Sequence, residues 1–180
     1  GVGRVADVQS DLACLEGGDA DLGVAGEVGF GALAERPPLI AHAGLDLNAR
    51  FNELGDDRSL GEVLLTPTRI YADSILRAQR QYSVKRIISG MAHITGGGLA
   101  DNLVRSIPSS VDAVIEPGSW PTPSIFGFLQ RHGKIADDEM ARVFNMGIGY
   151  CVIVKPAFAD SLAQRLTKLG ESVFTIGKIV

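Results

Sequence analysis

The sequence has few cysteines and no long apolar run. Its two cysteines, Cys14 and Cys151, lie far apart and show no CxxC spacing. This excludes a disulfide framework and a zinc site built on cysteine pairs, and it favours a reducing, cytoplasmic location. No run of 18 apolar residues occurs, and no basic segment followed by an apolar one opens the chain. We therefore expect no contact with a membrane.

A surplus of positive charge is also missing. The 180 residues carry a net charge of −4 at pH 7, and lysine and arginine form no stripe along the chain. We therefore expect no nucleic-acid partner. Hydrophobic residues make up 46% and charged residues 21% of the sequence, which is typical of a globular protein. A chain of this length predicts one domain that buries most of its apolar surface.

The sequence changes character near residue 39. Residues 1–38 are rich in glycine, hold no sustained period of 2 or 3.6, and end at Pro37 and Pro38. A helix cannot run through that pair without losing hydrogen bonds. The pattern predicts an irregular or divergent segment over residues 1–38 and a folded domain over residues 39–180. The last apolar segment runs to the end of the sequence, from which we expect a fragment of a longer protein.

From residue 66 onward the pattern alternates between helices and strands. Residues 66–82 predict a helix with Thr66 as its N-cap and Pro67 in its first turn, and with Ile70, Ile75 and Leu76 as its apolar stripe. Further helices are predicted over 98–107, 123–133, 136–145 and 157–170, and strands over 85–94, 111–117, 147–156 and 172–180. The order predicts an α/β fold (an α+β sandwich) in which helices cover a mixed β-sheet.

The segment "GMAHITGGGLADN" at residues 90–102 is the best candidate for a binding site. A strand is expected to end before Gly96, Gly97 and Gly98, and a helix to begin after them. Free backbone N–H groups at the positive end of a helix dipole suit a phosphate. Thr95 could add a hydroxyl group, and His93 shares its face of the strand. A tight turn whose glycines serve packing explains the pattern equally well, and no Walker A or GxGxxG motif is present.

Four segments together resemble one family. They are "LGEVLLTPTRIY", "GMAHITGGGLADN", "GSWPTPSIF" and "FNMGIGYCVIV", in this order over residues 60–154. Jointly they are highly specific, and residues 39–180 resemble the C-terminal half of phosphoribosylformylglycinamidine cyclo-ligase, also called aminoimidazole ribonucleotide (AIR) synthetase. The first and third segments favour this family over the related thiamine-monophosphate kinase. Residues 20–38 do not resemble the family, which a reading-frame slip or a divergent insert would explain, and its N-terminal domain is absent.

The resemblance implies an ATP-dependent ligase of purine biosynthesis. In that reaction ATP phosphorylates the formyl oxygen of formylglycinamidine ribonucleotide, a nitrogen of the same substrate attacks, and phosphate leaves as the imidazole ring closes. The resemblance implies ATP and Mg²⁺ as cofactors, bound mostly by the N-terminal domain, and a homodimer when the protein is full length. The C-terminal half would supply the glycine-rich phosphate site and one wall of the substrate cleft. We expect the isolated fragment to be inactive.

Each candidate site residue also has a structural interpretation. His93 is the catalytic candidate, as a proton carrier or phosphate donor, or it is a residue of the core. Thr68 and Arg69 are expected in the first turn of a helix, where Arg69 pairs with a substrate phosphate or with a surface carboxylate. Asn145 and Gly147 bind substrate or cap a helix end. No metal ligands are predicted, since Asp137, Asp138 and Glu139 favour a helix start through its dipole.

A second class of function stays open. The chain could be a non-catalytic phosphate- or nucleotide-binding module, or a structural half that acts only with a separate partner chain. The missing N-terminal domain separates these alternatives from an active ligase, because it supplies most of the family's nucleotide contacts.

Overall fold

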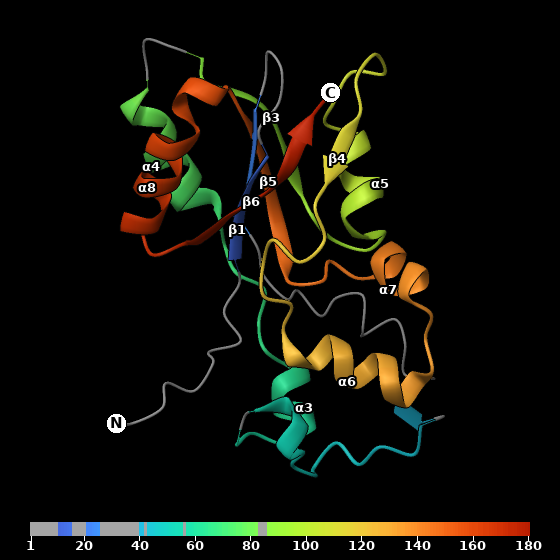
Figure 1. The fold of residues 1–180 in the computed structure, drawn as a ribbon. Coiled ribbons are helices and arrows are strands. Elements are labelled where there is room, and N and C mark those ends of the chain that lie inside the picture. Colours follow the sequence, from blue (N-terminus) through green and yellow to red (C-terminus); the bar gives the residue numbers. More distant parts are fainter. Residues whose placement is uncertain (1–10, 16–20, 26–39, 42, 56, 83–85) are drawn as a thin grey trace.

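The structure, a computed structural model, describes residues 11–15, 21–25, 40–41, 43–55, 57–82 and 86–180. Within these residues the central element is a six-stranded sheet of order β3-β5-β1-β2-β6-β4 (Figure 1). β5 runs antiparallel to β3 and parallel to β1, so the sheet is mixed, as predicted. The strands are β1 Asp11–Leu15, β2 Asp21–Ala25, β3 Ile88–His93, β4 Ala113–Ile115, β5 Ile148–Val154 and β6 Ser172–Ile179.

β1 and β2 lie inside the segment that the sequence predicts to be irregular. Both occupy the middle of the sheet, between β5 and β6, and they pair with each other antiparallel from Leu12 opposite Ala25 to Leu15 opposite Leu22. The structure differs from the expectation at these ten residues. The other residues of 1–38 lie outside the described part of the chain, and the domain boundary at residue 38 stays a prediction.

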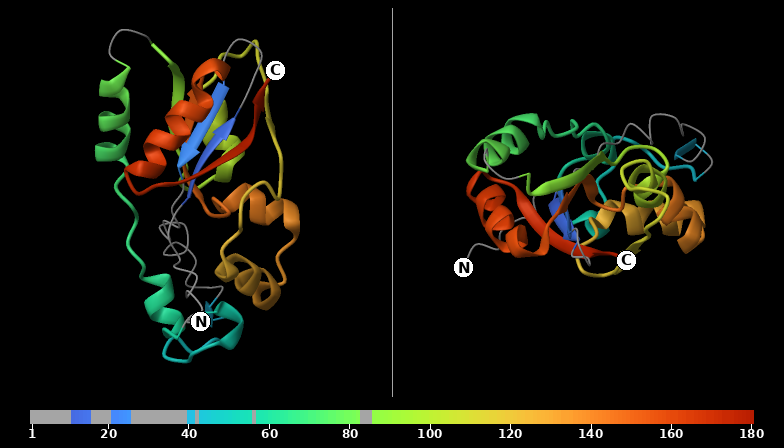
Figure 2. Two further views of the ribbon diagram at one scale, coloured as in Figure 1. Left: turned by 60° about the vertical axis from the view of Figure 1, so that its left-hand side comes forward. Right: turned by 90° about the horizontal axis from the view of Figure 1, so that it is seen from above.

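Helices cover both faces of the sheet. The helices of the described residues include α3 Leu60–Leu64, α4 Ala72–Gln81, α5 Gly98–Val104, α6 Ser124–Gly133, α7 Asp137–Val143 and α8 Ala159–Lys168, with 3-10 turns η1 at Asn52–Leu54 and η2 at Pro156–Phe158. α4 and α8 lie side by side on one face and α5 on the other (Figures 1 and 2). No helix of the described residues is long and apolar enough to cross a membrane.

β5 is the centre of the packing. Its side chains alternate between the two faces, as a strand buried on both sides requires. Val152 and Val154 face α4 and α8 and contact the cluster that contains Ile75 and Leu162. Cys151 and Ile153 face the opposite cluster, which contains Leu103 of α5 and Trp120. The β-branched residues that predict this strand therefore also supply the core on both sides.

A third cluster forms a helical lobe beyond the end of the sheet. It joins η1, α3, α6 and α7 (lower half of Figure 1) around Leu60, Phe126, Phe128 and Met140, all of which are buried. The lobe and the sheet are joined by residues 65–71, which lead into α4, and by the contact between α5 and α7.

The helix predicted over residues 66–82 starts later than expected. α4 begins at Ala72, and residues 66–71 have no regular secondary structure. Thr66 is therefore not an N-cap, and its hydroxyl donates a hydrogen bond back to the Val63 carbonyl at 2.8 Å. The predicted apolar stripe is wrong in two of three places, because Ile75 is buried while Ile70 and Leu76 are 82% and 51% exposed. The other predicted helices and strands are confirmed, and each is shorter than predicted at one or both of its ends.

Candidate functional site

A pocket of about 600 Å³ lies between α4, the end of β3 and the segment before α4. Thr68, Arg69 and His93 line it together, so three of the predicted site residues meet although His93 lies 24 positions after Arg69 in the sequence. Apart from Gln79, its other lining residues are apolar or aromatic. The remaining lining residues are Ile70, Tyr71, Ala72, Ile75, Leu76, Gln79, Met91 and Tyr150.

Three aromatic rings form one wall of this pocket. The ring centroid of His93 lies 6.0 Å from that of Tyr71 and 6.1 Å from that of Tyr150, and the two tyrosine rings are 5.2 Å apart. Tyr71 is buried and His93 is exposed. His93 therefore keeps access to a ligand while its ring rests against the other two, and it is not a core residue.

The phenol of Tyr150 stays protonated over the physiological range. Burial raises its pKa above the ordinary value of 10.0, because a low-dielectric environment disfavours the charged phenolate. Its hydroxyl group lies 3.7 Å from the Met91 sulfur and donates to it. The aromatic wall of the pocket is therefore uncharged at Tyr150.

Arg69 is fixed by residues from the far end of the chain. Its Nε lies 2.9 Å from Oε2 of Glu171, and its NH2 group donates to the Gly170 carbonyl at 2.8 Å. The prediction that Thr68 and Arg69 lie in the first turn of a helix is wrong, since α4 begins at Ala72. The contacts to Gly170 and Glu171 hold this segment outside the helix, along the pocket.

The glycine loop, residues 95–98, lies beyond the end of β3 and leads into α5. Thr95 and Gly96 are exposed, whereas Gly98 is buried. A Cβ at Gly98 would overlap the Ala141 carbonyl oxygen at the end of α7, and its φ of +64° also favours glycine. A packing requirement therefore explains Gly98. It does not explain Gly96, where a Cβ would meet nothing within 4 Å.

Asn102 fixes the shape of the glycine loop. Its side-chain amide donates to the Gly98 carbonyl at 2.7 Å and to the Gly96 carbonyl at 3.3 Å, and the residue is buried. These bonds turn the two carbonyl groups toward Asn102. Asp101 lies on the same turn of α5, and its carboxylate oxygen would stand 3.0 Å from a Cβ at Gly97.

Asn145 and Gly147 form the junction between α7 and β5. The Asn145 side-chain oxygen accepts a hydrogen bond from the Gly147 amide at 3.1 Å, and Asn145 is buried. A Cβ at Gly147 would lie 2.5 Å from Cδ of Pro123. Neither residue lines the 600 Å³ pocket, and neither do the residues of the glycine loop. The structure thus brings together Thr68, Arg69 and His93 there, and places the other candidates elsewhere.

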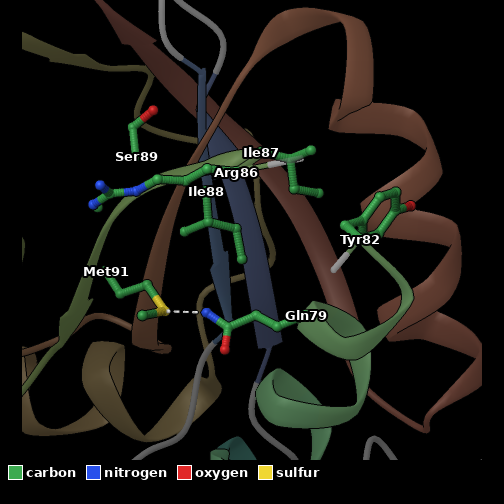
Figure 3. Close-up of a pocket in the computed structure, with 8 residues that line it drawn as sticks. Gln79, Tyr82, Arg86, Ile87, Ile88, Ser89 and Met91 are labelled. Atoms are coloured by element: carbon green, nitrogen blue, oxygen red, sulfur yellow. Dashed lines mark hydrogen bonds between the residues drawn. The ribbon is translucent and has the colours of Figure 1, made fainter. Parts of the chain in front are cut away.

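A second pocket of about 340 Å³ continues along α4 and β3 (Figure 3). The lining of this second pocket includes Tyr82, Arg86 and Ser89. The apolar side chains of β3, and that of the residue before β3, also line it. Gln79 and Met91 line both pockets, and the Gln79 amide donates to the Met91 sulfur at 3.8 Å across their boundary (Figure 3). The two pockets therefore adjoin along one side of α4.

Several residues of the site were not predicted from the sequence. Tyr71 and Tyr150 belong to the quoted segments "LGEVLLTPTRIY" and "FNMGIGYCVIV", so an aromatic residue in each was the available signal. Glu171 carries no such signal, because a single glutamate after a glycine looks like surface. Among the described residues no group of three or more His, Cys, Asp or Glu could hold a metal ion.

Fold and pocket define an α/β domain with a ligand-sized pocket at the side of its sheet. The chain belongs to the family described as AIR synthase related protein, C-terminal domain, which it matches over residues 18–180. The expected resemblance is therefore confirmed. The match also begins earlier than residue 39 and includes part of the segment in which no resemblance was expected.

Individual relatives carry one name. The chain is 42% identical over 169 residues to a phosphoribosylformylglycinamidine cyclo-ligase of Nitrosospira multiformis, covering 92% of the chain and 45% of that relative. It is 43% identical over 144 residues to the protein of the same name from Bacillus velezensis, covering 80% and 40%. It is 42% identical over 173 residues to the protein of the same name from Burkholderia cenocepacia, covering 94% of the chain and 46% of that relative. The chain spans less than half the length of these relatives.

Proposed function

We propose that the chain acts as the C-terminal part of a phosphoribosylformylglycinamidine cyclo-ligase, which closes formylglycinamidine ribonucleotide to 5-aminoimidazole ribonucleotide at the expense of ATP. The observation that carries the proposal is the meeting of Thr68, Arg69 and His93 in one pocket. The names of the relatives support the reaction. Their greater length supports a further domain or a partner chain that completes the site.

The chain's own contribution is to bind and orient the substrate. Ring closure driven by phosphoryl transfer depends on positioning and charge neutralisation more than on a protein nucleophile. Arg69 and Thr68 offer a cation and a hydroxyl group to a phosphate, and the rings of Tyr71 and Tyr150 offer a flat apolar surface. His93, exposed beside them, is the candidate for moving a proton or donating a hydrogen bond.

ATP and Mg²⁺ are the proposed cofactors of the complete enzyme. Mg²⁺ prefers carboxylate oxygens, and the described residues form no cluster of them. We therefore assign the metal to the remainder of the protein and no ligand to the described residues of this chain. When bound, Mg²⁺–ATP supplies the phosphoryl group. We also propose that the complete enzyme is a cytoplasmic homodimer, on the resemblance alone.

The glycine loop is proposed as a separate, weak phosphate site. The amides of Thr95, Gly96 and Gly97 have no backbone acceptor among the described residues, which supports anion binding there. The nearby carboxylate of Asp101 opposes it, as like charges repel. Asn145 and Gly147 are proposed to support the site through the α7–β5 junction rather than by ligand contact.

A test is to rebuild the complete enzyme. The chain is mixed with the N-terminal half of the Nitrosospira multiformis relative, and ATP-dependent formation of the aminoimidazole product is followed. We expect no product from the chain alone and product from the mixture. His93→Ala should abolish activity in the mixture, whereas His132→Ala, a histidine in α6 outside the pocket, should preserve it.

The alternative functions predict different results. If the two halves bind each other but form no product, the chain is a non-catalytic phosphate- or nucleotide-binding module, or a purely structural half. Product from the chain alone would contradict the need for a second domain. Equal activity of the His93→Ala and His132→Ala mixtures would remove His93 from the site.

A further inference from the structure

A buried carboxylate lies directly behind the pocket arginine. The side chain of Glu171 is 2% exposed, and that of Arg69 is 25% exposed. Glu171 stands between the end of α8 and the start of β6, and Arg69 reaches it from the segment before α4. Burying a carboxylate is costly unless it is paired and hydrogen-bonded, so the partners of Glu171 matter to the stability of this arrangement.

Glu171 is contacted from two directions. Its Oε2 forms an ion pair with Nε of Arg69 at 2.9 Å, although it accepts no hydrogen bond among the described residues. Its Oε1 accepts a hydrogen bond from the Ser74 hydroxyl in α4. Ser74 is itself buried. The carboxylate therefore has one fixed position, defined by α4 on one side and by the segment before α4 on the other.

The arginine is not used up by these contacts. A guanidinium has five N–H groups. The ion pair with Glu171 turns Nε toward the carboxylate, and the bond to the Gly170 carbonyl takes one N–H group on NH2. Three N–H groups are left on a side chain that also lines the 600 Å³ pocket. The two interpretations of Arg69, a salt bridge and a phosphate ligand, are therefore compatible in one side chain.

We propose that Glu171 is a positioning residue that orients the guanidinium of Arg69, so that its remaining N–H groups bind a phosphate group of the ligand. The inference rests on the proposed function only in taking this pocket as a ligand site. A planar guanidinium binds phosphate through two parallel hydrogen bonds when its orientation is fixed. Glu171, Gly170 and Ser74 supply that fixed orientation before the ligand arrives, which lowers the entropy cost of binding.

Electrostatics and positioning predict opposite results at Glu171. Replacing the carboxylate by an amide removes a negative charge beside Arg69, and Coulomb attraction alone then predicts tighter binding of an anion. If orientation of the guanidinium is what matters, the same replacement weakens binding, because the side chain is free to turn. Whether the variant binds the anion more tightly or more weakly therefore separates the two explanations.

The experiment is a titration of the 180-residue chain with inorganic phosphate at constant ionic strength. Binding is followed through the NMR signal of the Arg69 Nε–H group and the backbone amides of residues 68–72. We expect Glu171→Gln to weaken binding at least about fivefold, about 1 kcal/mol, because the ion pair that orients Arg69 is lost. Equal or tighter binding by Glu171→Gln overturns the proposal.

A matched control lies in α4, the helix that also contains Ser74. Asp73 forms an exposed ion pair with Arg77 in α4, so Asp73→Asn also removes one negative charge but leaves Arg69 untouched. We expect its phosphate affinity to stay within about twofold of the original, since surface charges act weakly. A drop as large as that of Glu171→Gln would show a general effect of charge on the protein and would count against positioning.

Two further outcomes keep the inference separate from the proposed function. If Glu171→Gln does not fold, Arg69→Lys replaces it: lysine keeps the charge but lacks the planar fork, so unchanged affinity in that variant overturns the proposal. If only residues 96–99 respond to phosphate and Arg69 does not, the proposal fails while the ligase assignment stands. If Arg69 responds as expected but the rebuilt enzyme forms no product, the ligase assignment fails and the positioning role stands.

Discussion

Gly98 lies against the Ala141 carbonyl so closely that any side chain at this position would overlap that oxygen. The contact joins the first residue of α5 to the end of α7, and it is part of the connection between the sheet and the helical lobe. A backbone oxygen cannot rotate out of the way, unlike the end of a flexible side chain. Gly98 is therefore required by packing, whatever the glycine loop binds.

The first prediction compares two glycines with one backbone conformation. Gly98 and Gly55 both have a φ of +64°, but a Cβ at Gly55 would meet nothing within 4 Å. Gly55→Ala should cost about 1 kcal/mol of unfolding free energy for the left-handed conformation alone. Gly98→Ala should cost about 1–3 kcal/mol more, because it adds overpacking. Urea unfolding of both variants measures the difference, and equal losses would show that the α5–α7 contact can relax.

The second prediction concerns acid stability of the helical lobe. Glu53 of η1 accepts a hydrogen bond from Arg131 and lies 3.3 Å from Nε2 of His132, both near the end of α6. The Arg131 bond first, and then the His132 bond, lower the pKa of Glu53 below its ordinary value of 4.5. A carboxylate with a lowered pKa in the folded state stabilises the protein above the unfolded pKa, and this contribution is lost as pH falls through the folded pKa.

Glu53→Gln should therefore make unfolding less dependent on pH on the acid side. The original chain should lose unfolding free energy as pH falls from about 5 through the lowered pKa of Glu53, and the variant should lose less, with the two converging once Glu53 is protonated in the folded state as well. Glu116→Gln is the control, since Glu116 is exposed and has no ion pair among the described residues. Parallel pH curves for Glu53→Gln and the original chain would remove the Glu53 cluster as a source of acid sensitivity.

Local sequence signals predicted the regular elements well. Leu162 and Leu166 recur at helical spacing and are buried in α8, and the β-branched run of residues 152–154 lies in β5. A further local signal lies at the start of α3, where Ser59 and Glu62 form a capping box with the Ser-x-x-Glu spacing that is typical of this motif. These features depend on neighbours in sequence, so a single sequence contains them.

The late start of α4 and the missed strands both involve partners far away in the chain. Thr66 and Pro67 carry a valid helix-start signal, but Arg69 bonds to Gly170, 101 residues later, and holds its segment outside the helix. β1 and β2 have weak strand patterns and are defined by pairing with β5 and β6. The candidate site also contains residues with a local sequence signal and residues without one. His93 and Arg69 were found by motif, whereas Glu171 becomes visible only where the fold places it behind Arg69.

The last prediction tests the glycine loop as a phosphate site. Backbone amides at residues 95–97 favour an anion,, whereas the Asp101 carboxylate beside Gly97 disfavours one,. Binding of inorganic phosphate should therefore be weak in the original chain, and Asp101→Asn should tighten it about threefold, the effect of one partly screened charge.

The control for this prediction is Asp112→Asn. Asp112 is an exposed carboxylate before β4, so the variant removes the same charge outside the loop and should leave phosphate binding unchanged. The readout is the shift of the amide signals of Gly96 to Leu99 during titration. If these signals stay in place in both variants while others move, the three glycines serve the turn and the contact with α7, and phosphate binds elsewhere.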